Sequence, residues 1–177
     1  MADQIRQWNV SGISGRDSIF EMTCYLLDSN IVTALEDQDK TGFELVTARL
    51  ASLADDDDAC ISILTAYEYQ HGIARAPDDL KDDLRESWKS FEDIFRIVPL
   101  SLEGAKRYGE LKVAYERHTG VGRRSLQERT VDLILASTAL EIGAVVVSDD
   151  KVFRTLQKID PAIRAENWKE PPGATAK

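Results

Sequence analysis

Acidic side chains follow apolar, strand-like segments at several places in this chain. Asp28 comes directly after the run "YLL", and Asp149 and Asp150 come directly after "AVVVS". Glu68 and Asp132 lie near the start of two helix-like segments. A carboxylate at the end of a buried strand is unfavourable unless it has a partner. Carboxylates that converge repel one another, and a bound divalent cation offsets this repulsion. Oxygen ligands without a Cys/His cluster favour Mg²⁺ or Mn²⁺ as that cation.

The elements that must position these acids alternate between strand-like and helix-like patterns. Strands are predicted at residues 25–27, 59–64, 95–100 and 144–148, with an edge strand at 164–168. Helices are predicted from residue 29 or 30, at 41–54, 65–74, 78–95, 101–120 and 130–143, and from about residue 150. Thr65 and Ser101 are the candidate helix caps, and Gly120 the candidate helix end. This alternation predicts an α/β fold with a central parallel sheet, whose ligands bind beyond the carboxyl ends of the strands.

Two of the acids also have simpler interpretations. Asp28 is well placed to cap the following helix, and Asp132 to offset a helix dipole. The chain has 31 acidic residues, so their spacing alone leaves a metal site and these structural roles as alternatives. The run of acids at 55–58 is interpreted as a solvated loop.

Length and composition place limits on the class of protein. A chain of 177 residues predicts one main domain, with an extension at 1–21, a domain at 22–170 and a frayed tail at 171–177. No apolar run approaches the ~20 residues of a membrane-spanning helix. Cys24 and Cys60 are expected to be buried thiols of a cytoplasmic protein. The net charge of −9 argues against bulk electrostatic coating of nucleic acid, but not against an acidic site with a basic rim.

Three segments resemble, in order, the motifs of the PIN-domain family, and specifically of VapC-like toxins of bacterial toxin–antitoxin pairs. These segments are "YLLDSNI", "ISILTAYEYQHGI" and "TVDLILASTALEIGAVVVSDDKVF". The family's acidic positions fall on Asp28, Glu68, Asp132 and Asp150. Accessory positions fall on Asn30, Ser148 and Asp149, and Ser29 and Ser148 stand where threonine is more frequent.

The resemblance implies a PIN-like α/β/α sandwich and a Mg²⁺-dependent endoribonuclease, with Mn²⁺ as an alternative ion. Asp28, Asp132 and Asp150 would hold the metal, and Glu68 would be a further ligand or would orient water. RNA would be hydrolysed by metal-activated water, leaving a 5′-phosphate and a 3′-hydroxyl. The resemblance also implies a cognate antitoxin as partner and a homodimer.

A basic segment precedes the predicted helix that carries Asp132. It contains Arg117, His118, Arg123, Arg124 and Arg129, with glycines that predict a flexible loop. We interpret these arginines as a rim that grips RNA phosphates; the alternative is a solvated loop that balances acidic charge. His71, near Glu68, is expected at the surface.

Two other functions are compatible with the same motifs. One is an RNA-processing PIN nuclease without an antitoxin, and the other is a catalytically silent interaction module. The complete acidic set argues against the second. The apolar stripe in residues 78–95 is expected to be core or a surface for a partner.

Overall fold

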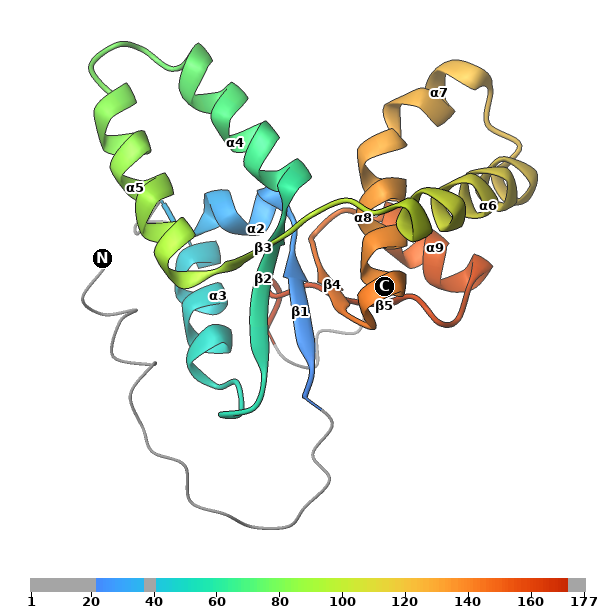
Figure 1. Ribbon diagram of the computed structural model, residues 1–177, viewed down its shortest axis with the longest axis horizontal. Coiled ribbons are helices and arrows are strands. Elements are labelled where there is room, and N and C mark those ends of the chain that lie inside the picture. The colour runs from blue at the N-terminus through green and yellow to red at the C-terminus, as the bar shows by residue number, and fades with distance from the viewer. Residues whose placement is uncertain (1–21, 37–40, 172–177) are drawn as a thin grey trace.

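The molecule is built around a parallel sheet of five strands (Figure 1). The computed structural model describes residues 22–36 and 41–171. The strands are β1 (Cys24–Leu27), β2 (Asp58–Ser62), β3 (Arg96–Val98), β4 (Val145–Val147) and β5 (Arg164–Glu166). Their order is β3-β2-β1-β4-β5, and every neighbouring pair is parallel. The predicted α/β fold with a central parallel sheet is confirmed.

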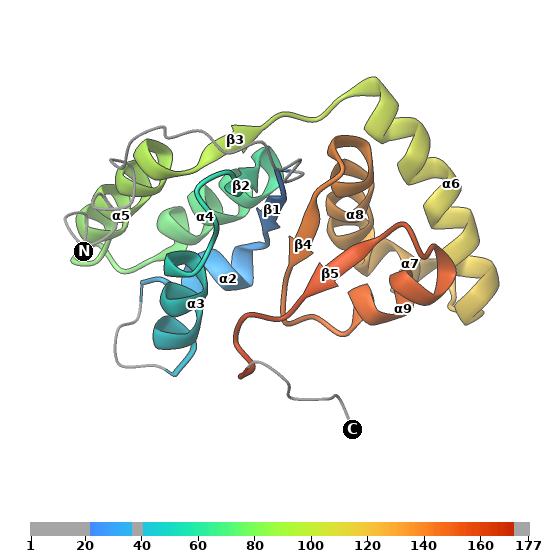
Figure 2. The same ribbon diagram turned by 90° about the horizontal axis from the view of Figure 1, so that it is seen from below.

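Helices cover both faces of this sheet, and the two groups of helices are consecutive in the chain (Figures 1 and 2). One face carries α2 (Ser29–Ala34), α3 (Thr41–Ala51), α4 (Ile63–Arg75) and α5 (Lys81–Ile94). The other carries α6 (Leu102–Thr119), α7 (Arg123–Glu128), α8 (Thr130–Ile142) and α9 (Val152–Ile159). The helices therefore change face where the chain leaves β3, and the predicted three-layer sandwich is confirmed.

The alternation of side chains along the strands divides the core into two halves. On β1, Leu26 and Leu27 are both completely buried but belong to different clusters. Leu26 packs with residues of α6, α8 and α9, whereas Leu27 packs with residues of α2 to α5. A strand that is buried on both faces requires apolar residues at successive positions, and the run "YLL" meets this requirement.

The apolar stripe of α5 is mainly core. Trp88, Phe91 and Phe95 are buried, and Tyr69 of α4 packs on the first two with ring centroids 5.0 and 5.8 Å away. Leu80, just before α5, is nearly half exposed. Most of this stripe therefore stabilises the fold.

Some predicted element ends are confirmed and others are wrong. Ser101 caps α6 by accepting from the amide of Gly104, and Gly120 ends that helix with a φ of 64°. The cap of α4 is Ser62 and not Thr65. Residues 123–128 form α7, so the basic segment predicted as a flexible loop is partly helical.

The two cysteines lie on adjacent strands. Cys24 of β1 and Cys60 of β2 are both buried and free, and their sulfurs are 2.9 Å apart. The predicted extension at 1–21 and residues 172–177 of the predicted tail lie outside the described residues. None of the helices in the described part of the chain has the length and apolar character needed to cross a membrane.

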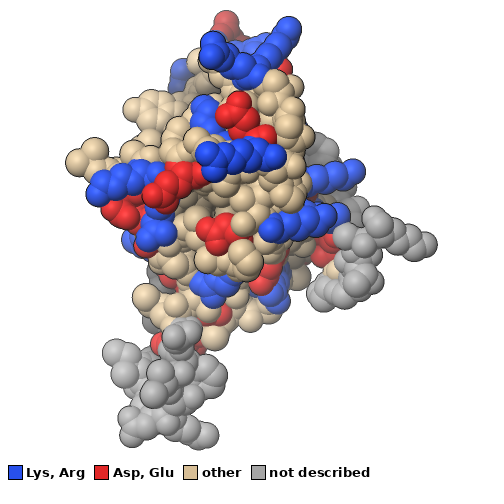
Figure 3. All heavy atoms as spheres, turned by 90° about the vertical axis from the view of Figure 1, so that its right-hand side faces the viewer, with Lys and Arg blue, Asp and Glu red and all other residues tan. Residues whose placement is uncertain are grey.

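Surface charge is mixed on the face that lies at the right of Figure 1. Basic and acidic side chains are interspersed there, with a group of basic side chains at the top of the view (Figure 3). Arg123 and Arg124 of α7 are both exposed. The large net negative charge thus coexists with local basic surface.

Candidate active site

The strand order places a topological switch point at the carboxyl ends of β1 and β4. From β1 the sheet grows through β2 to β3 on one side and through β4 to β5 on the other. The chain leaves β1 toward α2 and leaves β4 toward α9, on opposite faces of the sheet. In open α/β sheets, such a topological switch point is where ligands bind.

Asp28 lies at this switch point and is almost completely buried, with 7% of its surface exposed. Its backbone amide donates to the carbonyl of Val147, 3.0 Å away, which extends the β1–β4 pairing to the site. Its carboxylate caps α2 by accepting from the amide of Ser29 at 2.7 Å. The cap and the proposed functional role are therefore compatible, because the cap uses only Oδ1.

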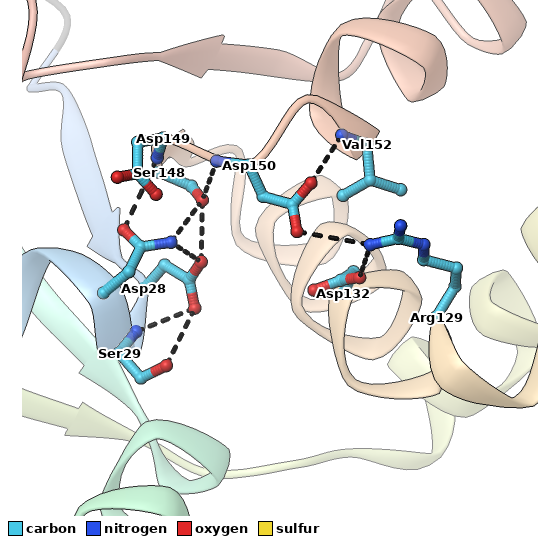
Figure 4. Close-up of polar contacts among 9 residues, drawn as sticks. Asp28, Ser29, Arg129, Asp132, Ser148, Asp149, Asp150 and Val152 are labelled. Atoms are coloured by element: carbon cyan, nitrogen blue, oxygen red, sulfur yellow. Dashed lines mark hydrogen bonds and ion pairs between the residues drawn. The ribbon is translucent and has the colours of Figure 1, made fainter.

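The other oxygen of Asp28 is held by side chains from both sides of the switch point (Figure 4). Ser148 Oγ donates to Oδ2 at 2.7 Å, and Asn30 Nδ2 donates to it at 2.8 Å. Asn30 Nδ2 also lies 3.0 Å from Ser148 Oγ. These contacts fix the orientation of a carboxylate that has little access to solvent.

The two adjacent acids after β4 have different environments. Ser148 Oγ accepts from the amide of Asp150 at 3.1 Å, and Asp150 itself accepts from the amide of Val152 at 2.9 Å. The carboxylate of Asp150 faces α8 (Figure 4). Asp149 instead pairs with Lys169 Nζ at 2.9 Å. Of the pair, Asp150 is the one directed toward Asp132.

Asp132 reaches the site from the first turn of α8. One atom, Nη1 of Arg129, lies 3.5 Å from Asp132 Oδ2 and 3.3 Å from Asp150 Oδ2 (Figure 4). Arg129 was predicted to contact RNA, and in this structure it links two of the predicted metal ligands. Sequence spacing placed it beside Asp132 but gave no indication of its contact with Asp150.

The carboxylates also influence one another's ionisation. Burial raises the pKa of Asp132 to about 6, with further contributions from the charges of Asp150 and Asp28 and a partial offset from Arg129. Burial raises the pKa of Asp28 too; hydrogen bonds from Ser148 and Ser29 oppose this, and the charges of Glu68 and Asp150 reinforce it. Burial is therefore the main reason why the pKa values of both carboxyl groups are raised, and the charges of neighbouring acids add to it.

Glu68 approaches Asp28 from the side of α4. It is exposed on α4 and, with Ser29, Glu36 and Tyr69, lines a separate cavity of about 320 Å³. Its charge acts on Asp28, but no contact between its side chain and Asp28, Asp132 or Asp150 is seen in the described part of the chain. Asp28 is thus within electrostatic range of Glu68 and Asp150, and Asp132 is within range of Asp150 and Asp28.

The remaining predicted RNA-binding residues lie outside the group of acids. Arg117 and His118 are exposed near the end of α6, and Arg123 is exposed at the start of α7. Arg124 pairs with Glu128 within α7 at 3.6 Å.

A larger cavity of about 720 Å³ adjoins the site on the side of α3, α9 and β5. Ser148 and Asp150 form part of its lining, together with Arg49, Arg154 and Trp168. Arg49 lies over the Trp168 ring, 5.8 Å from its centroid, and pairs with Glu166 at 3.0 Å. Asp149 and Asp150 therefore border a hollow whose lining includes cationic side chains, while Trp168 itself is buried.

The residues present fit a hard divalent cation in their chemistry. The acids offer oxygen donors only, and burial, reinforced by the charges of Asp150 and Asp28, raises the pKa of Asp132. Within residues 22–36 and 41–171, however, no three His, Cys, Asp or Glu side chains are close enough to form a ready-made metal site. Arg129 supplies the counter-charge in this arrangement.

The family model described as "PIN domain" matches residues 25–159. This chain belongs to the PIN domain family. The match includes Asp28, Glu68, Asp132 and Asp150, so all four predicted acids lie inside the PIN domain. None of the curated proteins matches the chain.

Solved structures share the fold of this PIN domain at low sequence identity. VapBC2 from Rickettsia felis, bound to a fragment of its promoter DNA, matches with a TM-score of 0.66 and 24% identity, covering 82% of this chain and 99% of that one. FitAcB from Neisseria gonorrhoeae matches with a TM-score of 0.65 and 24% identity, covering 83% and 99%. VapBC-5 from Mycobacterium tuberculosis, a member of the VapBC family of toxin–antitoxin systems, matches with a TM-score of 0.56 and 20% identity, covering 82% and 97%.

Proposed function

We propose that this PIN domain is a Mg²⁺-dependent endoribonuclease and the toxin of a type II toxin–antitoxin pair. The observation that carries the proposal is the convergence of Asp28, Asp132 and Asp150 at the β1–β4 switch point. These acids come from three distant segments of the chain, and burial and mutual repulsion raise the pKa of Asp132. Such a site is suited to a divalent cation and a phosphodiester substrate.

Asp28, Asp132 and Asp150 would hold the ion. A bound Mg²⁺ or Mn²⁺ would lower the pKa of a water molecule and offset the charge that develops on the phosphodiester. Ser148 and Asn30 keep the Asp28 carboxylate in one orientation through their hydrogen bonds to Oδ2. Glu68, on α4, would be a further ligand or would orient the water.

The substrate would be held by groups around the acids. The exposed arginines of α7 would contact backbone phosphates. The cavity beside Asp150, with Arg49 and Arg154 in its lining, offers cationic side chains to a nucleic-acid backbone.

The proposed partners follow from the solved structures with the same fold. VapBC-5 belongs to a toxin–antitoxin family, and another neighbour is a toxin–antitoxin complex from Klebsiella pneumoniae, with a TM-score of 0.52 and 18% identity over 83% of this chain and 99% of that one. By the same likeness, we propose a cognate antitoxin for this chain, and from the resemblance of its sequence to VapC-like toxins we propose a homodimer.

The decisive experiment is induced expression of wild type, Asp28→Asn and Asp56→Asn, with growth and RNA integrity followed together. Asp56 is an exposed acid outside the site and serves as the control. Growth arrest and RNA cleavage are expected for wild type and Asp56→Asn only, and purified protein should lose cleavage in EDTA. Toxicity that persists in Asp28→Asn would contradict the site assignment.

A further experiment separates a toxin from an RNA-processing nuclease. A toxin should have a neighbouring open reading frame whose co-expression restores growth and whose product co-purifies with this chain. Cleavage without growth arrest, and without such a partner, would support the RNA-processing alternative.

A further inference from the structure

Arg129 lies between two helices, as the C-cap of α7 and the N-cap of α8. It is the residue before α8, at the amino-terminal end of that helix, and its side chain makes no cap hydrogen bond. The amino-terminal end of a helix carries partial positive charge, which favours anions and disfavours a guanidinium. The dipoles of α7 and α8 therefore act on Arg129 in opposite directions, and its side chain is paired with the carboxylates of Asp132 and Asp150.

The contact joins two elements that are separate in the sequence. Nη1 of Arg129 approaches the Oδ2 atoms of Asp132, on α8, and of Asp150, in the loop after β4. A cation held by these two acids would use carboxylate oxygens that Arg129 now neutralises. A guanidinium and a divalent cation at this point would therefore compete for the same negative charge.

The geometry also indicates that the contact is weak enough to be exchanged. Its distances of 3.3 and 3.5 Å are longer than the ~2.7–2.9 Å of strong charge-assisted hydrogen bonds. The Arg129 side chain is 42% exposed, so solvent screens the pairs and leaves room for it to turn outward. A paired, bidentate guanidinium would be much harder to displace.

We propose that Arg129 is a resident counter-ion that holds Asp132 and Asp150 together until a divalent cation displaces it, so that Arg129 sets the metal affinity of the site. This inference rests on the proposed metal-dependent function of the same acids. When displaced, the guanidinium lies beside the site, where a substrate phosphate offers it a new anionic partner. Arg129 is thus a positioning residue. It pairs with the carboxylates of Asp132 and Asp150 when the metal is absent and with a substrate phosphate when the metal is bound.

The test is a calorimetric titration of purified protein with Mn²⁺ and with Mg²⁺, in the absence of RNA. Arg129→Gln removes the competing charge and is expected to tighten metal binding by about three- to thirtyfold, the range that one or two partly exposed ion pairs provide. Arg129→Lys, which keeps the charge, should tighten it less. Arg107→Gln is the matched control, because Arg107 is 43% exposed and pairs with Glu103 at 3.9 Å, on α6.

Metal affinity in Arg129→Gln that is equal to or weaker than that of wild type would overturn the proposal. So would equal tightening in Arg107→Gln, which would indicate a general charge effect, or the absence of metal binding in all variants. Since no RNA is present, these outcomes are independent of whether the protein cleaves RNA. Tighter binding in Arg129→Gln with no cleavage by wild type would support the inference while contradicting the proposed function.

A measurement on the wild-type protein guards against misfolding of the variant. The Nε–Hε resonance of Arg129 in an NMR spectrum should shift as Mg²⁺ saturates the site, and that of Arg107 should not. An Arg129 resonance that is unchanged at saturating Mg²⁺ would also overturn the proposal.

Discussion

Ser148 Oγ donates a 2.7 Å hydrogen bond to Oδ2 of Asp28, across 120 positions of sequence. The bond connects the ends of β1 and β4 and is buried from solvent. The same hydroxyl oxygen accepts from the amide of Asp150. Through these two hydrogen bonds, Ser148 holds the proposed metal ligands Asp28 and Asp150 in position without being a ligand itself.

Replacing Ser148 with alanine should destabilise the protein by about 1–3 kcal/mol, because a buried charged acceptor loses a donor. The loss should also raise the pKa of Asp28 further, since the Ser148 hydrogen bond lowers that pKa. Urea denaturation measures the change, with Ser148→Thr as the control that retains a hydroxyl. Equal stability of wild type and Ser148→Ala would show that the bond is not formed in solution.

Asp149 and Asp150 should differ in their effect on metal binding. Asp150 faces Asp132 and Asp149 pairs with Lys169, so Asp150→Asn should abolish the stabilisation by Mg²⁺ and Asp149→Asn should retain it. At an Mg²⁺ concentration ten times its dissociation constant, wild type should gain about 1.4 kcal/mol of stability. Thermal unfolding with and without Mg²⁺ measures this, and the reverse pattern would assign the ligand to Asp149.

The sheet and the convergence of the acids at its edge follow from patterns that are local in the sequence. Continuous apolar runs identify strands buried on both faces, and the helices between them require parallel pairing. The carboxyl ends of adjacent parallel strands necessarily meet, which places Asp28 near Ser148. The resemblance to PIN domains added the identity of Asp132, which spacing alone left open as a dipole-compensating residue.

The features that sequence did not predict depend on tertiary contacts. Asp149 turns away because of Lys169, which follows β5 and has no sequence signal that links it to the site. Thr65 fits the pattern of a helix cap, but it is buried and donates to the carbonyl of Leu27, while Ser62 provides the cap. Gly122, expected in a flexible loop, begins α7 as its N-cap.

Asp132 should make the metal-free protein less stable as the pH rises. Its pKa is raised from 3.8 to about 6, so the folded state favours the protonated form. The associated stability is complete below pH 3.8 and is lost as the pH rises through 6. The Asp132→Asn variant cannot lose this stability, and in EDTA it should be more stable than wild type by about 3 kcal/mol at pH 8.

The control for this experiment is Glu128→Gln, an acid of α7 whose side chain is 65% exposed. Urea unfolding at several pH values should show the difference between Asp132→Asn and wild type disappearing near pH 4. A constant difference across this range would indicate a packing effect, and the raised pKa of Asp132 would then be excluded as its cause.

The arginines of α7 should contribute to RNA affinity without determining the sequence that is cleaved. Both side chains are exposed, and phosphate contacts position a nucleic acid without specifying it. Arg123→Ala with Arg124→Ala should weaken binding and reduce the slope of log affinity against log salt by about 0.7 for each phosphate that the variant no longer binds. Lys81→Ala with Arg85→Ala on α5 is the control, since it removes the same charge from the opposite side of the sheet. Both slopes can be measured by fluorescence anisotropy in the Asp28→Asn background, which leaves the RNA uncleaved. If the α7 variant and the control variant have equal slopes, the arginines of α7 only balance acidic charge.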